Sequence, residues 1–364
     1  MNNIKKINKF LFSVFVIAFM LYIIKYPQSS SDIVLKGLNI CYIVIIPVIF
    51  PFLAFSKLFI NSSFFKILSR IFDKPSQILF GISGEYANAL LIGGIAGFPM
   101  GAKTVKEIYL RNNHKYKNEA ERTLAFCNNC SVSFAVSAAG MLVFNNIKIG
   151  FYLFFIQLIS AVITGTIIKI IFYDKNKNIG APFAAPVYMN KKIEIEKSSV
   201  AEMISESVTG ILNICGTVLF FYIVANILFE YLNFLPVLTD PINRQFIKTI
   251  VSGIFEISSG INSLVNLNIS EYYKIILASI ILSWTGISVH FQIIHIIKDL
   301  KISLKPYFTG KIIHGIISLV ISVIAFKTII ILFAAVLIFI AGVFVFYLFE
   351  KSLKNRKMQY NKKL

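Results

Sequence analysis

Between two apolar segments of this chain lies the sequence GGIAGFPMGAK, from Gly93 to Lys103. A degenerate version of it, SGIFEISSGINSL, runs from Ser252 to Leu264. Many membrane transporters consist of two related halves, each with a glycine-interrupted apolar segment at the corresponding place, and they bind their ligand between the halves. The two segments therefore make a transporter the first hypothesis for this chain.

The composition is that of an integral membrane protein. Hydrophobic residues make up 57% of the 364 residues and the mean hydropathy is +0.75, which is more apolar surface than a soluble fold of this length can bury. Most of the apolar runs reach the roughly 20 residues that a spanning helix needs. The ten runs cover residues 10–26, 38–59, 78–100, 123–144, 150–172, 207–232, 250–267, 272–297, 304–326 and 328–349.

The basic residues indicate how the chain crosses the membrane. A net charge of +19 would suggest nucleic-acid binding in a soluble protein, but here the lysines and arginines flank apolar runs, and no nucleic-acid partner is expected. If the third and seventh runs are re-entrant hairpins and the N-terminus is cytoplasmic, 28 of the 36 basic residues lie on the cytoplasmic side. We therefore predict an all-α polytopic membrane protein with about eight spanning helices, two re-entrant hairpins and both termini in the cytoplasm.

The two halves of the chain have the same order of segments: span, hairpin, span, span. The tripeptide from Asn39 to Cys41 matches that from Asn213 to Cys215, and Gly101 in the first hairpin corresponds to Gly260 in the second. Three spans and a re-entrant hairpin make an odd number of crossings, so the repeats must be inverted. The predicted parts are an N-terminal helix and loop (1–36), repeat 1 (37–172), a cytoplasmic linker (173–203), repeat 2 (204–326) and a last helix with a basic, lipid-facing tail (327–364).

The tip of the first hairpin suggests an anion site. Irregular backbone at membrane depth is tolerated only where protein or a water-filled cavity satisfies its polar groups. Gly97 and Gly101 permit close approach, Pro99 removes one donor, and the helix that resumes would point its N-terminus inward, where anions are favoured. Lys103 either adds a positive charge there or extends to the cytoplasmic surface, and both interpretations remain open.

The span after each hairpin holds a polar cluster that predicts an unwound helix centre. The first runs from Phe126 to Ser131 and the second from Ser283 to Gln292. Polar residues at this depth are costly, so a functional interpretation is the default, although single Ser and Thr residues often form only interhelical hydrogen bonds. The candidate substrate-binding residues are Gly97, Phe98, Pro99, Met100, Gly101, Lys103, Asn128, Asn129, Ser131, Ser258, Ser259, Gly260, Asn262, Trp284, Thr285, Gly286, Ser288, His290, Gln292 and Lys311.

Other titratable residues have less certain roles. Glu85 and Glu256 lie in the hairpin segments, where they either couple transport to protons or sodium or pair structurally with Lys103 or Lys311. His114 lies in a basic loop. His295 and His314 are expected as interhelical partners or as lining, with the first role preferred for His295.

Catalytic and metal motifs are missing from the sequence. Neither H-E-x-x-H nor G-x-S-x-G occurs, so we expect no enzyme and no cofactor. The pair Cys127-x-x-Cys130 lacks the further ligands of a zinc site and is expected to be two small packing residues.

The stretches GGIAGFPMGAKTV, EAERTLAFCNN, GIFEISSGINSL, TGISVHFQIIHI and KPYFTGKIIHGIIS resemble the family of sporulation integral membrane proteins known as YlbJ or SpoVV, within the nucleoside-recognition or gate-domain group. The likeness runs from about residue 35 to 322, and Cys130, Trp284 and Lys311 depart from the usual family choices. The resemblance implies a role in endospore formation, with dipicolinic acid moved from the mother cell across the outer forespore membrane.

The predicted function is transport of a small organic anion, with dipicolinate as the implied substrate, by alternating access in an architecture similar to that of concentrative nucleoside transporters. Lys311 and His290 would face Lys103 across the site, and Trp284 would stack on the substrate ring. A carrier of nucleosides or other small metabolites is the alternative of the same class, and a non-transporting membrane scaffold for spore assembly is the alternative of another. The coupling ion, the direction of transport and a homo-oligomeric state are left open.

Overall fold

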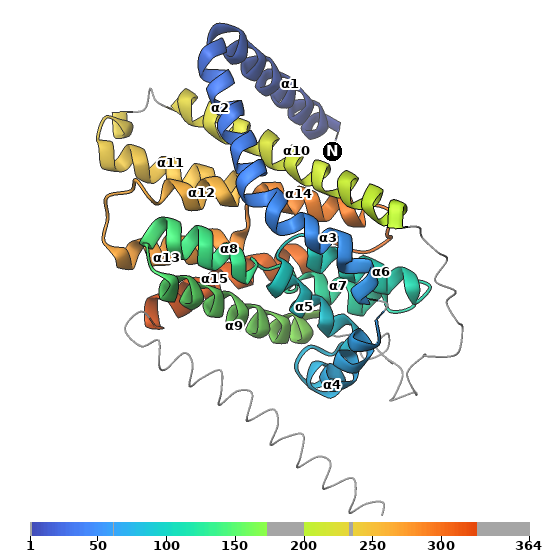
Figure 1. The fold of residues 1–364 in the computed structure, drawn as a ribbon. Coiled ribbons are helices and arrows are strands. Elements are labelled where there is room, and N and C mark those ends of the chain that lie inside the picture. The colour runs from blue at the N-terminus through green and yellow to red at the C-terminus, as the bar shows by residue number, and fades with distance from the viewer. Residues whose placement is uncertain (1, 61, 173–199, 233–235, 326–364) are drawn as a thin grey trace, which may run out of the picture.

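Figure 1 shows a computed structural model of the chain, which describes residues 2–60, 62–172, 200–232 and 236–325. Within these ranges the regular structure is entirely helical, without a β-strand. The predicted all-α fold is therefore confirmed for this part of the chain. Most of the predicted linker (173–199) and the whole predicted last helix (327–364) lie outside the described residues.

The first described helices cover the first two predicted apolar runs, residues 10–26 and 38–59. Helix α1 covers Asn2–Lys25 and α2 covers Pro27–Ile40, with Pro27 at the first helical position, where proline is well tolerated. The π-helix η1, Cys41–Ile45, then leads into α3, Ile46–Ile60. The predicted span at 38–59 is thus a helix with a π-helical interruption.

The first hairpin differs in its bounds from the prediction. Helix α4, Ser63–Phe80, meets α5, Gly84–Ala96, at an angle of 93°, and α6, Met100–Arg111, follows the turn at residues 97–99. Helices α5 and α6 form a helical hairpin that begins and ends later in the chain than the apolar run predicted at 78–100. Lys103, for which both the site and the cytoplasmic surface were left open, lies with Arg111 on α6.

The rest of the first half contains a broken span and a continuous one. Helix α7 covers Lys117–Leu124, irregular backbone follows to residue 131, and the short helix α8, Val132–Phe134, continues into the π-helix η2, Ala135–Val143. Helix α9, Ile147–Phe172, is an uninterrupted apolar helix. The unwound centre predicted between Phe126 and Ser131 is present.

The second half has a similar order of helices, although its described residues contain no counterpart of α4. Its elements are α10 (Val200–Leu232), the 3₁₀-helix η3 (Pro236–Leu238), α11 (Pro241–Phe255), α12 (Ile257–Ser263), α13 (Glu271–Trp284), α14 (Gly286–Ile297) and α15 (Lys305–Ala325). In Figure 1, α10 runs beside α2 and α3. The Cys41 thiol donates to the backbone oxygen of Cys215 at 3.6 Å, so the two matching tripeptides meet in space.

Four helical segments of the described residues are long and apolar enough to cross a membrane. Counting α4 and α5 as one bent span would give a fifth, and Ser13–Lys25 and Val132–Val143 are shorter apolar helices. The four are Ile147–Phe172, Ile204–Leu232, Glu271–Ile297 and Lys305–Ile324. The chain is therefore a helical membrane protein, while the total of eight spans and the re-entrant course of the hairpins stay predictions.

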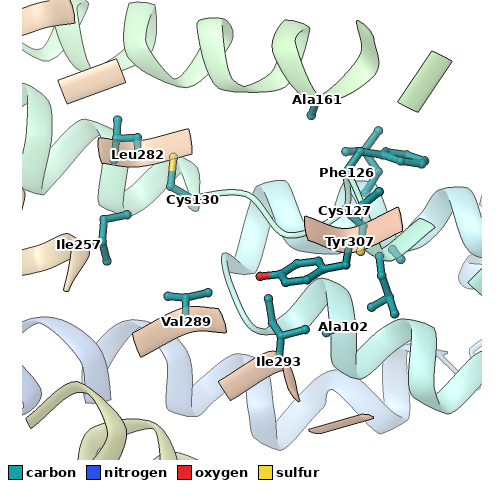
Figure 2. Packing of buried hydrophobic residues seen from close by; sticks show 14 of the residues in the cluster. Ala102, Phe126, Cys127, Cys130, Ala161, Ile257, Leu282, Val289, Ile293 and Tyr307 are labelled. Atoms are coloured by element: carbon teal, nitrogen blue, oxygen red, sulfur yellow. The ribbon is translucent and has the colours of Figure 1, made fainter. Parts of the chain in front are cut away.

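The hydrophobic core combines both halves and surrounds the helix breaks. Figure 2 shows Cys127 and Cys130 of the first half in one hydrophobic cluster with Ile257, Val289 and Tyr307 of the second. All of these side chains are at most 1% exposed. The interruptions in both halves are therefore held at the centre of the packing and not at the surface.

Candidate functional site

The glycines of the first hairpin let the broken span cross its tip. A Cβ atom added at Gly93 or Gly101 would collide with the backbone oxygen of Cys127. Gly97 has φ 85°, a left-handed conformation that favours glycine, and its added Cβ would lie 3.2 Å from the Ser131 backbone nitrogen. The sequence GGIAGFPMG therefore serves the close contact between the hairpin and the segment at residues 127–131.

Two neighbouring asparagines have different roles in this contact. The Oδ1 atom of Asn128 accepts a hydrogen bond from the backbone nitrogen of Ala102 at 2.8 Å, which satisfies a free amide in the first turn of α6. Asn129 donates to the backbone oxygen of Phe126 at 3.0 Å, and its buried Oδ1 has no partner among the described residues. Of the two predicted ligands, Asn128 is occupied by the fold, whereas Asn129 keeps a free acceptor.

The charged candidates of the first hairpin are Glu85, near the start of α5, and Lys103, near the start of α6. Glu85, in the first turn of α5, pairs with Arg111 at 3.2 Å and accepts from Asn112 at 3.1 Å. The alternative of a structural pair is therefore what the structure contains, but the partner is Arg111 and not Lys103 or Lys311. Lys103 is half-buried on α6.

A buried carboxylate lies at the turn of the second hairpin. Glu256, which separates α11 from α12, is 0% exposed, and its Oε2 accepts from the backbone nitrogen of Ser259 at 2.6 Å. Its Oε1 atom has no partner within the described part of the chain. Glu256, unlike Glu85, thus lies at a hairpin break with one oxygen available.

Other candidates on the second hairpin are less central. Ser259 and Gly260 are buried and Ser258 is half-buried, but Asn262 is exposed on α12. Because α12 is short and one face packs on the core, Asn262 falls on the opposite face. Its role as a substrate-binding residue stays a prediction.

The second broken span passes directly over this hairpin tip. Thr285 and Gly286 both have positive φ angles, 70° and 80°, which end α13 and restart the chain as α14. A Cβ at Gly286 would lie 3.1 Å from the Cα of Glu256. The arrangement matches the first half, where the hairpin tip also packs against the following helix break.

Trp284 contributes to the contact between the second broken span and its hairpin. Its Nε1 donates to the backbone oxygen of Ile254 at 3.1 Å, so the indole ties α13 to α11. Its ring meets the imidazole of His290 edge-on, with centroids 4.6 Å apart. In this conformation the indole of Trp284 therefore contacts Ile254 and His290, and its stacking on a substrate ring stays a prediction.

Helix α14 contributes a group of buried polar atoms. The Nδ1 atom of His290 lies 2.5 Å from the Tyr307 hydroxyl, and its Nε2 has no partner among the described residues. The same holds for the Ser288 hydroxyl and for Oε1 of Gln292. The predicted site residues Ser288, His290 and Gln292 therefore lie on α14, the helix that follows the break at Thr285.

Lys311 of α15 joins the two broken spans. Its Nζ donates to the backbone oxygen of Asn128 at 2.6 Å and to that of Ser283 at 3.3 Å, and the residue is 1% exposed. One turn earlier on α15, Tyr307 reaches His290. Within the described chain, Lys311 forms no ion pair with a carboxylate, and its Nζ atom is hydrogen-bonded to backbone oxygens.

A second buried polar group was not predicted. Gln157 of α9 donates to the backbone oxygen of Ser279 and to the Ser318 hydroxyl, both at 3.0 Å, and its own backbone oxygen lies 3.2 Å from Nε2 of His314. The signal was available, because Gln157 is a polar residue in the middle of the apolar run at 150–172. The interhelical histidine is therefore His314, whereas His295, for which that role was preferred, is exposed.

Fold and site together define a helical integral membrane protein with two hairpins, each packed against an interrupted apolar helix. The chain is similar to the sporulation integral membrane protein YlbJ of Bacillus subtilis (strain 168), with 23% identity over 345 residues, which cover 89% of this chain and 84% of the relative. The match confirms the resemblance to a sporulation integral membrane protein that the motifs predicted. No family model and no solved structure matches the chain.

Proposed function

We propose that the chain is a membrane carrier of a small organic anion, and that dipicolinate is its substrate at the outer forespore membrane of a sporulating cell. The observation that carries this proposal is the position of Lys311, a buried cation between two helix breaks. An unpaired charge in a buried site costs several kcal/mol unless a partner compensates it. A bound carboxylate would be that partner.

The arrangement of helices fits alternating access. Two segments of equal order, 37–172 and 204–326, would be inverted repeats, with α5–α6 and α11–α12 as the re-entrant hairpins. Transporters of this type bind substrate where interrupted helices meet near the membrane midplane. Because Lys311 contacts both interrupted helices, a substrate held there would sense the relative position of the two halves.

The choice of dipicolinate depends on the resemblance and on charge. Dipicolinate is a small, flat dianion, and YlbJ is by its name a sporulation protein. In this proposal one carboxylate pairs with Lys311, while Nε2 of His290 and the half-buried Lys103 are the further cationic or donor groups near the breaks. A nucleoside would instead use the amides and carboxylates, such as Asn129 and Glu256.

The test is uptake of labelled dipicolinate and of labelled uridine into proteoliposomes. Wild-type protein should take up dipicolinate, and Lys311→Met should lose this uptake, while Lys148→Met, at an exposed lysine in the first turn of α9, should keep it. Lys103→Ala tests whether that residue belongs to the site. Uptake of uridine alone would move the function to a nucleoside carrier, and uptake of neither would favour a scaffold.

A further inference from the structure

We propose that the anion is carried together with a proton, with Lys311 as the proton-binding group in the site and His314 as its relay. This inference rests on the proposed function and names its coupling ion. It follows from the surroundings of Lys311 and from a stripe of buried polar residues that leads away from it.

The surroundings of Lys311 contain no compensating negative charge. Its titratable neighbours are the thiols of Cys127 and Cys130 from the broken segment, His290 from α14, and Tyr307 and His314 on α15 itself. The two backbone oxygens that it contacts accept from an amine as well as from an ammonium group. An empty site therefore favours the neutral amine, whereas a site that holds a carboxylate favours the ammonium ion.

Binding of the anion consequently requires a proton. In the balanced step, the lone pair of the Lys311 amine takes one proton, and the resulting ammonium pairs with the carboxylate. When the anion leaves on the other side, the ammonium again lacks a counter-charge and the proton leaves too. Each cycle then moves one proton with one anion in the same direction.

His314 has the geometry of a proton acceptor beside this site. A backbone oxygen can only accept, so the contact with Gln157 at 3.2 Å assigns the hydrogen to Nε2 of His314. The basic nitrogen is therefore Nδ1, which is buried and has no partner among the described residues. Nδ1 can take a proton without breaking the existing hydrogen bond and pass it to Lys311, three residues earlier on the same helix.

A polar stripe extends from Lys311 along α15. Lys311, His314, Ser318 and Ser322 share one face of the helix, and each is at most 1% exposed. At 1.5 Å per residue the stripe spans roughly 16 Å, about half of a hydrocarbon core roughly 30 Å thick. The stripe can therefore connect the site to one membrane face.

The neighbouring helices continue the stripe. Gln157, Ser160 and Thr164 of α9 are fully buried, and α13 adds Ser279 and Ser283. Oε1 of Gln157, Oγ1 of Thr164 and Oγ of Ser279 have no partner in the described ranges. A purely structural set of interhelical hydrogen bonds would leave fewer such atoms unpaired, because an unpaired polar group in the membrane is costly.

The experiment compares exchange with accumulation of labelled dipicolinate in proteoliposomes. In exchange, substrate is present on both sides, so the proton that leaves with one anion is taken up again with the next anion on the same side. Net movement of protons through the relay is then not needed. In accumulation, the outside is made acidic and a protonophore is the negative control. Wild-type protein should perform both, with accumulation abolished by the protonophore.

His314→Gln should keep exchange and lose at least about tenfold in accumulation, as expected when a general acid–base group is removed. His295→Gln, at an exposed histidine of α14, is the matched control and should behave as the wild type. The wild type also provides a test without variants: dipicolinate added at equal pH should acidify the interior, as read by trapped pyranine, and protein-free vesicles should not respond.

Exchange that is accompanied by accumulation without pH dependence, or full proton-driven accumulation by His314→Gln, would overturn the inference and leave the proposed function intact. Absence of exchange by the wild type would overturn the proposed function and the inference with it.

Discussion

The Nζ atom of Lys311 lies 2.6 Å from the backbone oxygen of Asn128, 183 residues earlier in the chain. The same nitrogen reaches the backbone oxygen of Ser283, so one side chain contacts the interrupted helices of both halves. In each half the interrupted helix also packs on its own hairpin tip. A substitution of Lys311 should therefore alter the structure around both hairpin tips.

Loss of Lys311 should loosen the first helix break. An intramolecular hydrogen bond contributes about 0.5–1.5 kcal/mol, and Lys311→Met removes two of them. Cys127 and Cys130, both 0% exposed, should then react with N-ethylmaleimide at least about tenfold faster. The measurement uses protein in which Cys41 and Cys215 are serine, and Lys148→Met should leave the labelling rate unchanged.

Gly101→Ala should disrupt the first hairpin. The added methyl group would collide with the backbone oxygen of Cys127. Neither the methyl group nor this oxygen can move away unless the backbone shifts. We expect a loss of about 2 kcal/mol or more in unfolding free energy, as for other overpacked sites, measured as a lower thermal midpoint in detergent. The control is Gly315→Ala on α15, where an added Cβ meets nothing within 4 Å; equal effects of the two substitutions would contradict the described contact.

The matching cysteines of the two halves should be linkable. The Cys41 thiol lies 3.6 Å from the backbone oxygen of Cys215. With Cys127 and Cys130 replaced by serine, copper phenanthroline should join the halves after cleavage at a protease site introduced in the linker. Failure to link, with free thiols still titratable, would argue against the contact between η1 and α10.

Glu119 of α7 should make stability depend on pH. Its carboxylate accepts from the backbone nitrogen of Ser83 at 2.7 Å, while Arg122 donates to the backbone oxygen of Gly81 at 2.5 Å, so α7 fixes the turn between α4 and α5. Burial raises the pKa of Glu119 above its ordinary value, an effect that these hydrogen bonds and Arg122 only partly oppose.

Because the folded pKa is raised, the carboxyl group favours folding when it is protonated, and this contribution is lost as the pH rises through the folded pKa. Glu119→Gln, which keeps an acceptor without the charge, should therefore be at least as stable as the wild type at pH 7. The difference should shrink as the pH falls toward the ordinary carboxyl range. Thermal unfolding across pH measures it, and a variant much less stable at pH 7 would show that the charged form is the favoured one.

The sequence predicted the parts of the fold whose signals are local. Glycines within apolar runs, with Pro99 in the first of them, indicated where both helical hairpins turn, and dense polar clusters located both helix breaks. Helix α4 was not predicted because its apolar residues alternate with Lys66 and Arg70 and do not form a continuous run. Helix α6 lies outside the predicted apolar run for the same reason, since it carries both core residues and charges.

The site was predicted less completely, because roles within it depend on distant partners. The sequence pointed to Asn128 and Asn129 equally, yet the free amide of Ala102 occupies the first and leaves an acceptor on the second. Glu85 resembled Glu256 until Arg111 was found beside it. Gln157 and His314 are 157 residues apart, and only the packing of α9 on α15 brings them together.

The most direct test of the central claim is equilibrium binding of labelled dipicolinate to purified protein in detergent, with Lys311→Met and Lys148→Met alongside. We predict saturable binding to the wild type and to Lys148→Met, and affinity at least about tenfold weaker for Lys311→Met, since loss of a buried charge partner typically costs 2 kcal/mol or more. Unchanged affinity in a folded Lys311→Met protein would contradict the account, because the anion would then have to be bound elsewhere.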